Sequence, residues 1–355
     1  MSQTAANPPA ESGKPDPASG RRQLVLGAAA VALLALRAAQ AQAQTQTQTQ
    51  TQTQTQTQAQ ALTQTQTQPQ PQTQTAIEDP DPVIETLQLA GAQLEVQFAP
   101  GFDERLQQLA LAWVRQAALA VAAYFGRFPV TEVVLLLVPM DGAGIFAGTT
   151  FGEPDLMVRL RLGRSTTQAQ FTEDWILVHE MVHLAVPRVP PAQNWLHEGL
   201  ATYVESVARG RAGLVTADTV WHQWVKVMPQ GQPRSGDAGL DHTPTWGRTY
   251  WGGAIFCLRA DVQMLVHSAR RAGLRQALQG VLAAGGHFGL AWPVDRVLAT
   301  ADAAVGQTTL TDLYQQMKAS PQPTDLDGLW RSLGVLDSGF DEAAPLAAVR
   351  RAILS

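Results

Sequence analysis

The stretch FTEDWILVHEMVHLAV, residues 171–186, decides how this sequence is interpreted. His179 and His183 are four positions apart, so on a helix both imidazoles project from one face and can reach a common metal ion. Glu180 lies about 100° around such a helix from His179, beside the metal rather than on it. Zinc lowers the pKa of a bound water to about 7, and a carboxylate in that position can take the proton. The H-E-x-x-H pattern therefore favours a zinc-binding helix that carries its own general base.

Two histidines alone also fit a partly exposed helix whose imidazoles bind nothing, so a third ligand has to decide. A catalytic zinc takes three protein ligands and keeps one position open. In NWLHEGLATYVE, residues 194–205, Glu198 follows His183 with fourteen residues between them. A Pro-rich turn, PRVPPAQN, ends the first helix, and Asn194 can cap a second helix from which Glu198 faces back. His197 is a competing ligand, but it points about 100° away from Glu198, so only one of the two can face the metal.

Glu205 follows Glu198 by seven residues, which places it on nearly the same face of the second helix, two turns on. That position suits a carboxylate that orients a histidine ligand from behind. The alternative is an ordinary exposed helix carboxylate.

HEMVH followed by WLHEGLATYVE resembles the gluzincin metallopeptidases, above all the glycyl aminopeptidase family and, more distantly, aminopeptidase N-like enzymes. The resemblance covers residues 141–354 and implies a thermolysin-like catalytic domain. It implies one zinc ion per chain with His179, His183 and Glu198 as ligands. The segment TYWGGAIFCLRADVQM matches the family's Y-x-K-G element, so Tyr250 is implied to stabilise the oxyanion of the tetrahedral intermediate. A purely structural aromatic is the alternative reading of this tyrosine.

The sequence departs from that family in the residues that would select a substrate. Gly252 stands where the Y-x-K-G element has its lysine. Aminopeptidases of this plan hold the free amine with a carboxylate, and Glu153 in TTFGEP is the only acidic candidate, a weak match. His242, in DHTPTW, is the remaining histidine best placed to line the cleft, and the loop and edge strand over residues 148–163 can add an extended peptide. Hydrolysis of a peptide or protein substrate is thus better supported than aminopeptidase specificity.

The N-terminal part has the composition of an export signal followed by a tether. In residues 1–43, Arg21 and Arg22 precede thirteen apolar or Gly residues (24–36) and A-x-A-like sites. Thirteen residues are short for a membrane span, which needs about 20, although an uncleaved anchor is the alternative and a twin-arginine route stays open. Residues 44–76 are almost pure Thr-Gln alternation, which predicts a disordered, low-complexity tether. We expect export to the periplasm, cell envelope or exterior of a bacterium, with membrane contact only through an uncleaved signal.

The remaining residues, 77–355, are predicted to form an α+β metallopeptidase-like domain, with a small β-rich portion over 77–165 and a mostly helical portion over 166–355. In the β-rich portion the patterns predict, in order, a hairpin over 83–100, a helix over 103–126, a buried strand over 131–139, a Gly-rich loop over 141–154 and an edge strand over 155–163. In the helical portion they predict helices near 172–186, 196–209, 216–227, 248–270, 272–284, 291–303 and 308–318.

The net charge of the chain limits the classes of macromolecule that it is expected to bind. Without the first 43 residues the chain keeps 21 basic and 28 acidic residues, a net charge of −7. An acidic domain without basic runs argues against nucleic acid and anionic membranes as partners. The single cysteine, Cys257, lies in the apolar run AIFCL and is expected to be inert core.

The sequence thus predicts an exported zinc metallopeptidase. Two other classes remain open at this point: a non-catalytic, zinc-stabilised binding module of the envelope, and a zinc hydrolase of a non-peptide amide or ester. Glu180 and Tyr250 count against a pure binding module, because such a module needs neither residue.

Overall fold

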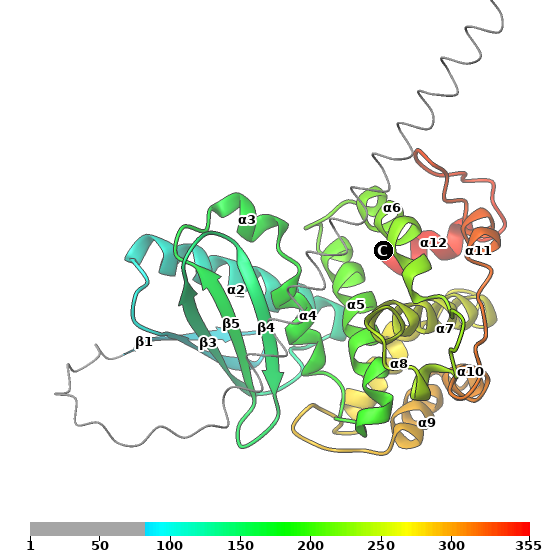
Figure 1. Ribbon diagram of the computed structural model, residues 1–355, viewed down its shortest axis with the longest axis horizontal. Coiled ribbons are helices and arrows are strands. Elements are labelled where there is room, and N and C mark those ends of the chain that lie inside the picture. The colour runs from blue at the N-terminus through cyan, green and yellow to red at the C-terminus, as the bar shows by residue number, and fades with distance from the viewer. Residues whose placement is uncertain (1–81) are drawn as a thin grey trace, which may run out of the picture. The chain divides into compact units, whose positions relative to one another are not determined.

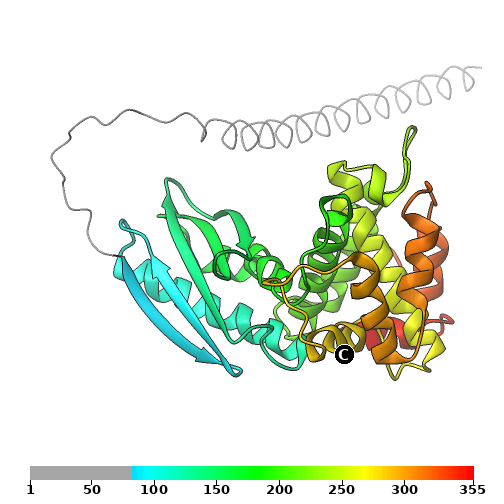
Figure 2. The same cartoon turned by 90° about the horizontal axis from the view of Figure 1, so that it is seen from below.

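The computed structural model describes residues 82–355, so the predicted export signal (1–43) and the predicted tether (44–76) lie outside the described residues. Within the described range, no helix combines the length and the apolar character that crossing a membrane requires. The α+β prediction is confirmed, because a five-stranded sheet comes first and a mostly helical portion follows (Figures 1 and 2).

The sheet has the strand order β1-β2-β3-β5-β4. The predicted hairpin is confirmed: β1 and β2 pair antiparallel around Ala90 and Gly91, whose φ angles of 49° and 81° suit a tight two-residue turn. β3 runs parallel to β2 and to β5, and β4 pairs antiparallel with β5. The strand bounds are β1 Val83–Leu89, β2 Ala92–Phe98, β3 Glu132–Met140, β4 Ile145–Phe151 and β5 Met157–Gly163.

The edge of the sheet differs from the sequence prediction. Residues 155–163 were expected at the edge, but β5 is an inner strand, and the expected loop over 141–154 contains the edge strand β4. Apolar and polar residues alternate in β5 because one face of the strand, with Val158, Leu160 and Leu162, is fully buried. An inner strand with one buried face shows the same alternation as an edge strand, so the pattern did not distinguish them. β4 was missed because Gly, Ala and Thr give it no apolar alternation; its backbone pairs with β5 alone among the described strands.

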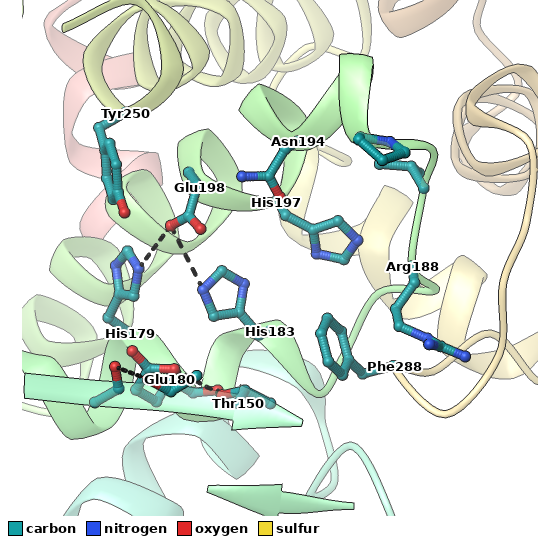
Figure 3. Close-up of a pocket in the computed structure, with 14 residues that line it drawn as sticks. Thr150, His179, Glu180, His183, Arg188, Asn194, His197, Glu198, Tyr250 and Phe288 are labelled. Atoms are coloured by element: carbon teal, nitrogen blue, oxygen red, sulfur yellow. Dashed lines mark hydrogen bonds and ion pairs between the residues drawn. The ribbon is translucent and has the colours of Figure 1, made fainter. Parts of the chain in front are cut away.

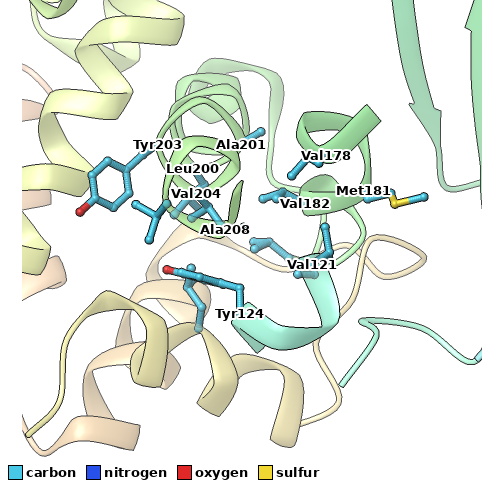
Figure 4. Packing of buried hydrophobic residues seen from close by; sticks show 14 of the residues in the cluster. Val121, Tyr124, Val178, Met181, Val182, Leu200, Ala201, Tyr203, Val204 and Ala208 are labelled. Carbon is cyan, nitrogen blue, oxygen red and sulfur yellow. The ribbon is translucent and has the colours of Figure 1, made fainter. Parts of the chain in front are cut away.

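Helix α2 (Glu104–Phe125) packs against both parts of the fold. Asp103 caps its start by accepting a hydrogen bond from Leu106 N at 2.7 Å, and Gly126 ends it in the left-handed conformation, so the helix expected over 103–126 forms. Figure 4 shows Val121 and Tyr124 of this helix packed with apolar side chains of α4 and α5.

The predicted helices are present with shifted ends, and two are divided: the one over 172–186, and the one over 248–270, which forms as the π-helical η4 followed by α7. The helix expected over 172–186 forms as α3 and α4, because the Asp174 carboxylate accepts hydrogen bonds from Ile176 N and Leu177 N, both at 3.1 Å, and starts a new helix. The helices are α3 Gln168–Glu173, α4 Ile176–His183, α5 Asn194–Arg211, α6 Ala217–Val227, α7 Gly253–His267, α8 Leu274–Ala283, α9 Val294–Val305, α10 Thr309–Met317, α11 Leu326–Leu333 and α12 Ala347–Leu354, with short turns η1 Pro191–Gln193, η2 Met228–Gly231, η3 Leu240–His242 and the π-helical η4 Gly247–Gly252.

Helices α5 and α7 meet backbone to backbone. A Cβ atom at Gly199 would lie 2.3 Å from Gly253 Cα, and one at Gly253 would lie 2.3 Å from Trp195 O. This contact sets η4, which precedes α7 directly, against the first turns of α5. Cys257 is buried in α7 as expected, and burial raises the pKa of its thiol, which makes it unreactive.

Candidate metal centre

Helices α4 and α5 bring three side chains together. His179 and His183 project from one face of α4, and Glu198 faces them from α5 (Figure 3). One ligand atom from each of the three lies within 4.8 Å of the others. The Nε2 atoms of His179 and His183 are 3.3 Å and 3.7 Å from Glu198 Oε2.

This donor set fits a zinc ion. A tetrahedral ion with bonds of about 2.0–2.2 Å holds its ligand atoms roughly 3.3–3.6 Å apart, close to the two distances given above. Burial lowers the pKa of His183 to about 3, so its ring nitrogen carries a free lone pair at neutral pH. Burial acts to raise the pKa of Glu198, but the hydrogen bond with His179 and the electrostatic interactions with His183 and His179 outweigh it and lower the pKa to about 2. A neutral imidazole at His183 and an ionised carboxylate at Glu198 are ligand states that zinc needs.

The competing ligand His197 is held elsewhere. Its Nε2 lies 2.8 Å from Pro187 O, so the ring is hydrogen-bonded to the backbone that follows α4. His197 lines the same cavity, but its atoms are outside the three-residue cluster.

Glu180 lies beside the cluster with its carboxylate fixed by the sheet. The Thr150 hydroxyl is 2.7 Å from Glu180 Oε2 and 2.9 Å from the Glu180 carbonyl, so it can donate to either oxygen. Burial raises the pKa of Glu180, partly offset by His179 and by the Thr150 hydrogen bond. A carboxylate with a raised pKa in a cavity is suited to accept and release a proton.

β4 reaches Glu180 because Gly148 has no side chain. A Cβ atom at this position would lie 2.4 Å from Glu180 Cγ and 2.8 Å from its Oε1. Gly148 and Thr150 are therefore site residues that the sequence analysis missed. The only signal was the Gly- and Thr-rich composition, which was interpreted as a loop.

For the peptide hydrolysis that the sequence predicts, we expect Gly148→Ala to lower kcat/KM by about 100-fold, because the added methyl group must displace the Glu180 carboxylate and a shift of about 1 Å is enough for such a loss. The metal ligands are untouched, so zinc content should equal that of the unsubstituted chain. Ala147→Ser, on the other face of β4, is the matched control and should leave kcat/KM within about 2-fold. Normal kinetics of Gly148→Ala would show that β4 does not fix the position of Glu180.

Tyr250 stands above the ligands on the π-helical turn η4. Its ring stacks on that of His179 with centroids 6.2 Å apart and on that of Trp246 with centroids 5.9 Å apart. Burial, followed by the charges of Glu198 and Glu180, raises the pKa of Tyr250, which keeps its hydroxyl protonated as a donor. Figure 3 shows the hydroxyl directed toward Glu198 and the cavity.

Glu205 is buried, so the exposed-carboxylate alternative does not hold. It accepts hydrogen bonds from Ser206 Oγ and from Arg209 Nη1, the latter at 3.3 Å. The Nδ1 atom of His179 is buried and has no hydrogen-bond partner among the described residues. Among residues 82–355 the hydrogen bonds of Glu205 thus go to its own helix, and its predicted support of a histidine ligand stays a prediction.

The two weaker sequence candidates do not line the cavity. His242 is exposed on η3, so the expectation that it lines the cleft is not met. Glu153 follows β4 with its side chain 71% exposed and is paired with Arg188, which does line the cavity. Arg188, Asn194 and Phe288 are lining residues that the sequence analysis did not place in the site. They come from a loop, a helix start and a distant connection, which share no sequence pattern.

The cavity has a volume of about 650 Å³ and opens between β4, α4, α5 and the α8–α9 connection. Its fourteen lining residues are Gly148, Thr149, Thr150, His179, Glu180, His183, Arg188, Val189, Pro191, Asn194, His197, Glu198, Tyr250 and Phe288.

Comparison with known proteins shows the fold. No family model matches the sequence, and no curated protein is significantly similar to it. Among solved structures, an aminopeptidase N family protein from Idiomarina loihiensis matches with a TM-score of 0.54 and 12% identity, over 72% of this chain and 49% of that chain. An M1 zinc metallopeptidase from Deinococcus radiodurans matches with a TM-score of 0.42 and 15% identity, over 69% of this chain and 54% of that chain. This chain thus spans about half the length of those proteins, and it has the aminopeptidase N-like fold that the resemblance of its motifs implied.

Proposed function

Starting from the aminopeptidase N-like fold, we propose that this chain is a zinc-dependent metallopeptidase that hydrolyses peptide bonds. The observation that carries the proposal is the convergence of His179, His183 and Glu198 in one cavity with the buried carboxylate of Glu180. Zinc held by these three residues would supply Lewis-acid chemistry and bring the pKa of water to about 7.

Glu180 is the general base in this proposal. Its carboxylate accepts a proton from the attacking water and passes it to the departing nitrogen of the cleaved peptide bond. The Thr150 hydroxyl, 2.7 Å from Oε2, limits the rotation of the carboxylate, and Gly148 leaves it room. The Tyr250 hydroxyl donates a hydrogen bond to the scissile carbonyl oxygen as negative charge develops there.

The cavity favours cleavage away from a free N-terminus. Among residues 82–355, the only carboxylates that line it are Glu180 and Glu198, and the proposal uses both. Glu153, the one candidate for binding a substrate amine, is exposed and paired with Arg188. The edge strand β4 can instead bind an extended peptide through backbone hydrogen bonds.

The alternatives differ from this proposal in their chemistry. A non-catalytic zinc module needs no buried carboxylate held beside the ligands by a neighbouring strand, so the Glu180–Thr150 contact favours catalysis. Hydrolysis of a non-peptide amide or ester would use the same residues, and only substrates separate it from peptide hydrolysis. Export to the periplasm, envelope or exterior remains part of the proposal and rests on residues 1–43.

The full chain, purified and loaded with zinc, is expected to bind one zinc per chain and to cleave peptides from a mixed library, with products identified by mass spectrometry. A chelator should abolish cleavage, and added zinc should restore it. N-acetylated and free peptides should be cut at similar rates, because no carboxylate is left to hold an amine. Zinc binding without cleavage of peptides, amides or esters would support the binding module instead, and strict dependence on a free amine would contradict the proposed internal cleavage.

A further inference from the structure

Arg188 lines the far end of the same cavity. Figure 3 shows it across the metal ligands from Tyr250, with Phe288 between it and His183. Its backbone is held on both sides: Arg188 N donates to Leu290 O at 2.8 Å, and its carbonyl accepts from Trp292 N at 2.9 Å. Arg188 lies between α4 and α5, and its backbone is held in place by these hydrogen bonds to the α8–α9 connection.

The side chain of Arg188 passes through a tight gap. A Cβ atom at Gly152, just after β4, would lie 2.7 Å from Phe288 O and 3.2 Å from Arg188 Cδ and Nε. Because residue 152 is a glycine, the end of β4, the aliphatic part of Arg188 and Phe288 can pack together. Phe288 also faces His197, with ring centroids 5.4 Å apart, and its aromatic ring lines the same cavity as Arg188.

Arg188 is the permanent cation among the residues that line the cavity. Its side chain is 31% exposed, and its pairing with Glu153 Oε1 uses Nη2. Arg188 Nε is buried and has no hydrogen-bond partner among residues 82–355. An exposed ion pair of this kind contributes little stability, so another carboxylate can replace Glu153 at small cost.

We propose that Arg188 is a specificity-determining residue that binds a carboxylate of the peptide substrate near the scissile bond. The guanidinium fork matches a carboxylate with two parallel hydrogen bonds, and Phe288 packs against the apolar part of the same substrate residue. Glu153 competes for the guanidinium and lowers the affinity for such substrates. This inference rests on the proposed function and adds to it a substrate class: peptides with an Asp or Glu side chain, or a free C-terminal carboxylate, close to the cleaved bond.

The test uses zinc-loaded full chain and peptide pairs that differ only in Glu against Gln, with the pair moved through the positions on each side of the bond. A second pair differs only in a free or amidated C-terminus, which separates side-chain from terminal carboxylates. At one position, kcat/KM should favour the acid over the amide by about 10-fold or more, mainly through KM. Arg188→Gln should bring this ratio to about one, and Glu153→Gln should raise it.

The two variants separate the proposal from a structural role of the pair. If the pair only ties β4 to the neighbouring loop, both substitutions should lower the melting temperature alike and leave the acid-to-amide ratio unchanged, and the inference is then wrong. If Arg188→Gln does not fold, Arg188→Lys replaces it, because lysine keeps the charge but loses the fork and should reduce the ratio.

Failure of the inference also differs from failure of the proposed function. Cleavage with the same ratio in every variant would leave the metallopeptidase proposal intact and overturn the role of Arg188. If the full chain cleaves no peptide, fluorescence anisotropy of the same labelled peptides replaces kinetics. Tighter binding of the acidic peptide that Arg188→Gln removes would then support the carboxylate site, and equal binding of both peptides would contradict it.

Discussion

Glu180→Gln is expected to retain zinc and to lose peptide hydrolysis, with kcat/KM lower by about 10²–10⁴-fold, the usual contribution of a general base. Gln has nearly the shape of Glu, so the contact with Gly148 and the hydrogen bond from Thr150 can persist. What the substitution removes is the carboxylate that accepts the proton. Metal analysis and steady-state kinetics on one preparation measure both quantities.

The matched control for Glu180→Gln is Glu173→Gln, on the exposed end of α3 a few residues before the zinc helix. It should keep zinc and kcat/KM unchanged within about 2-fold, since exposed substitutions of this kind have small effects. Comparable activity of Glu180→Gln and the control would show that another group takes the proton. Loss of zinc from Glu180→Gln would show that Glu180 supports the metal and not only the water.

The zinc helix and the element order followed from local rules, which is why the sequence predicted them. The spacing of His179 and His183 places both on one face of any helix, and the alternation of β1 and β2 needs no distant partner. The aminopeptidase N-like fold, predicted from the zinc motifs, is confirmed. The roles of the ligands and of Tyr250 stay predictions, although the structure brings these side chains into one cavity.

The parts that the sequence did not predict depend on contacts between distant segments. Thr150 meets Glu180 across thirty residues, and nothing in AGTTF marks it as a strand that approaches a helix. Arg188 meets Phe288 and Glu153 only because three connections converge at one end of the cavity. The break at Asp174 shows the same limit at short range, since a carboxylate inside a helical pattern began a new helix there.

Glu205 shows how far a periodicity argument extends. Glu205 lies two turns after Glu198 and is buried, so only the exposed alternative is removed, and its role behind a histidine ligand stays a prediction. Periodicity gives the face but not the hydrogen-bond partner. Ser206 and Arg209 lie nearby on the same helix, and the Glu205 carboxylate bonds to them.

Glu198→Gln is expected to weaken zinc binding by more than about 100-fold. Removing a residue that only supports a zinc ligand costs up to about 100-fold in affinity, and here a ligand itself is changed. The amide keeps the shape of the side chain but removes the negative charge that the two histidines face at 3.3 Å and 3.7 Å. Competition with a fluorescent chelator measures the zinc Kd. The rise in melting temperature on adding zinc should shrink in parallel, because a zinc ion that binds more weakly stabilises the folded state less.

His197→Gln, at the adjacent position on α5, separates the two candidate ligands. His197 Nε2 is 2.8 Å from Pro187 O and takes no part in the ligand cluster. The zinc Kd of this variant should therefore stay within about 3-fold of that of the unsubstituted chain. This change is smaller than the loss of affinity that follows removal of a residue supporting a zinc ligand. The opposite result, zinc lost from His197→Gln and retained by Glu198→Gln, would make His197 the third ligand. Both side chains would then have to turn by about 100° around α5, and the Glu198-centred geometry would be wrong. Similar losses in both variants would show that the start of α5 binds zinc as a unit rather than through Glu198 alone.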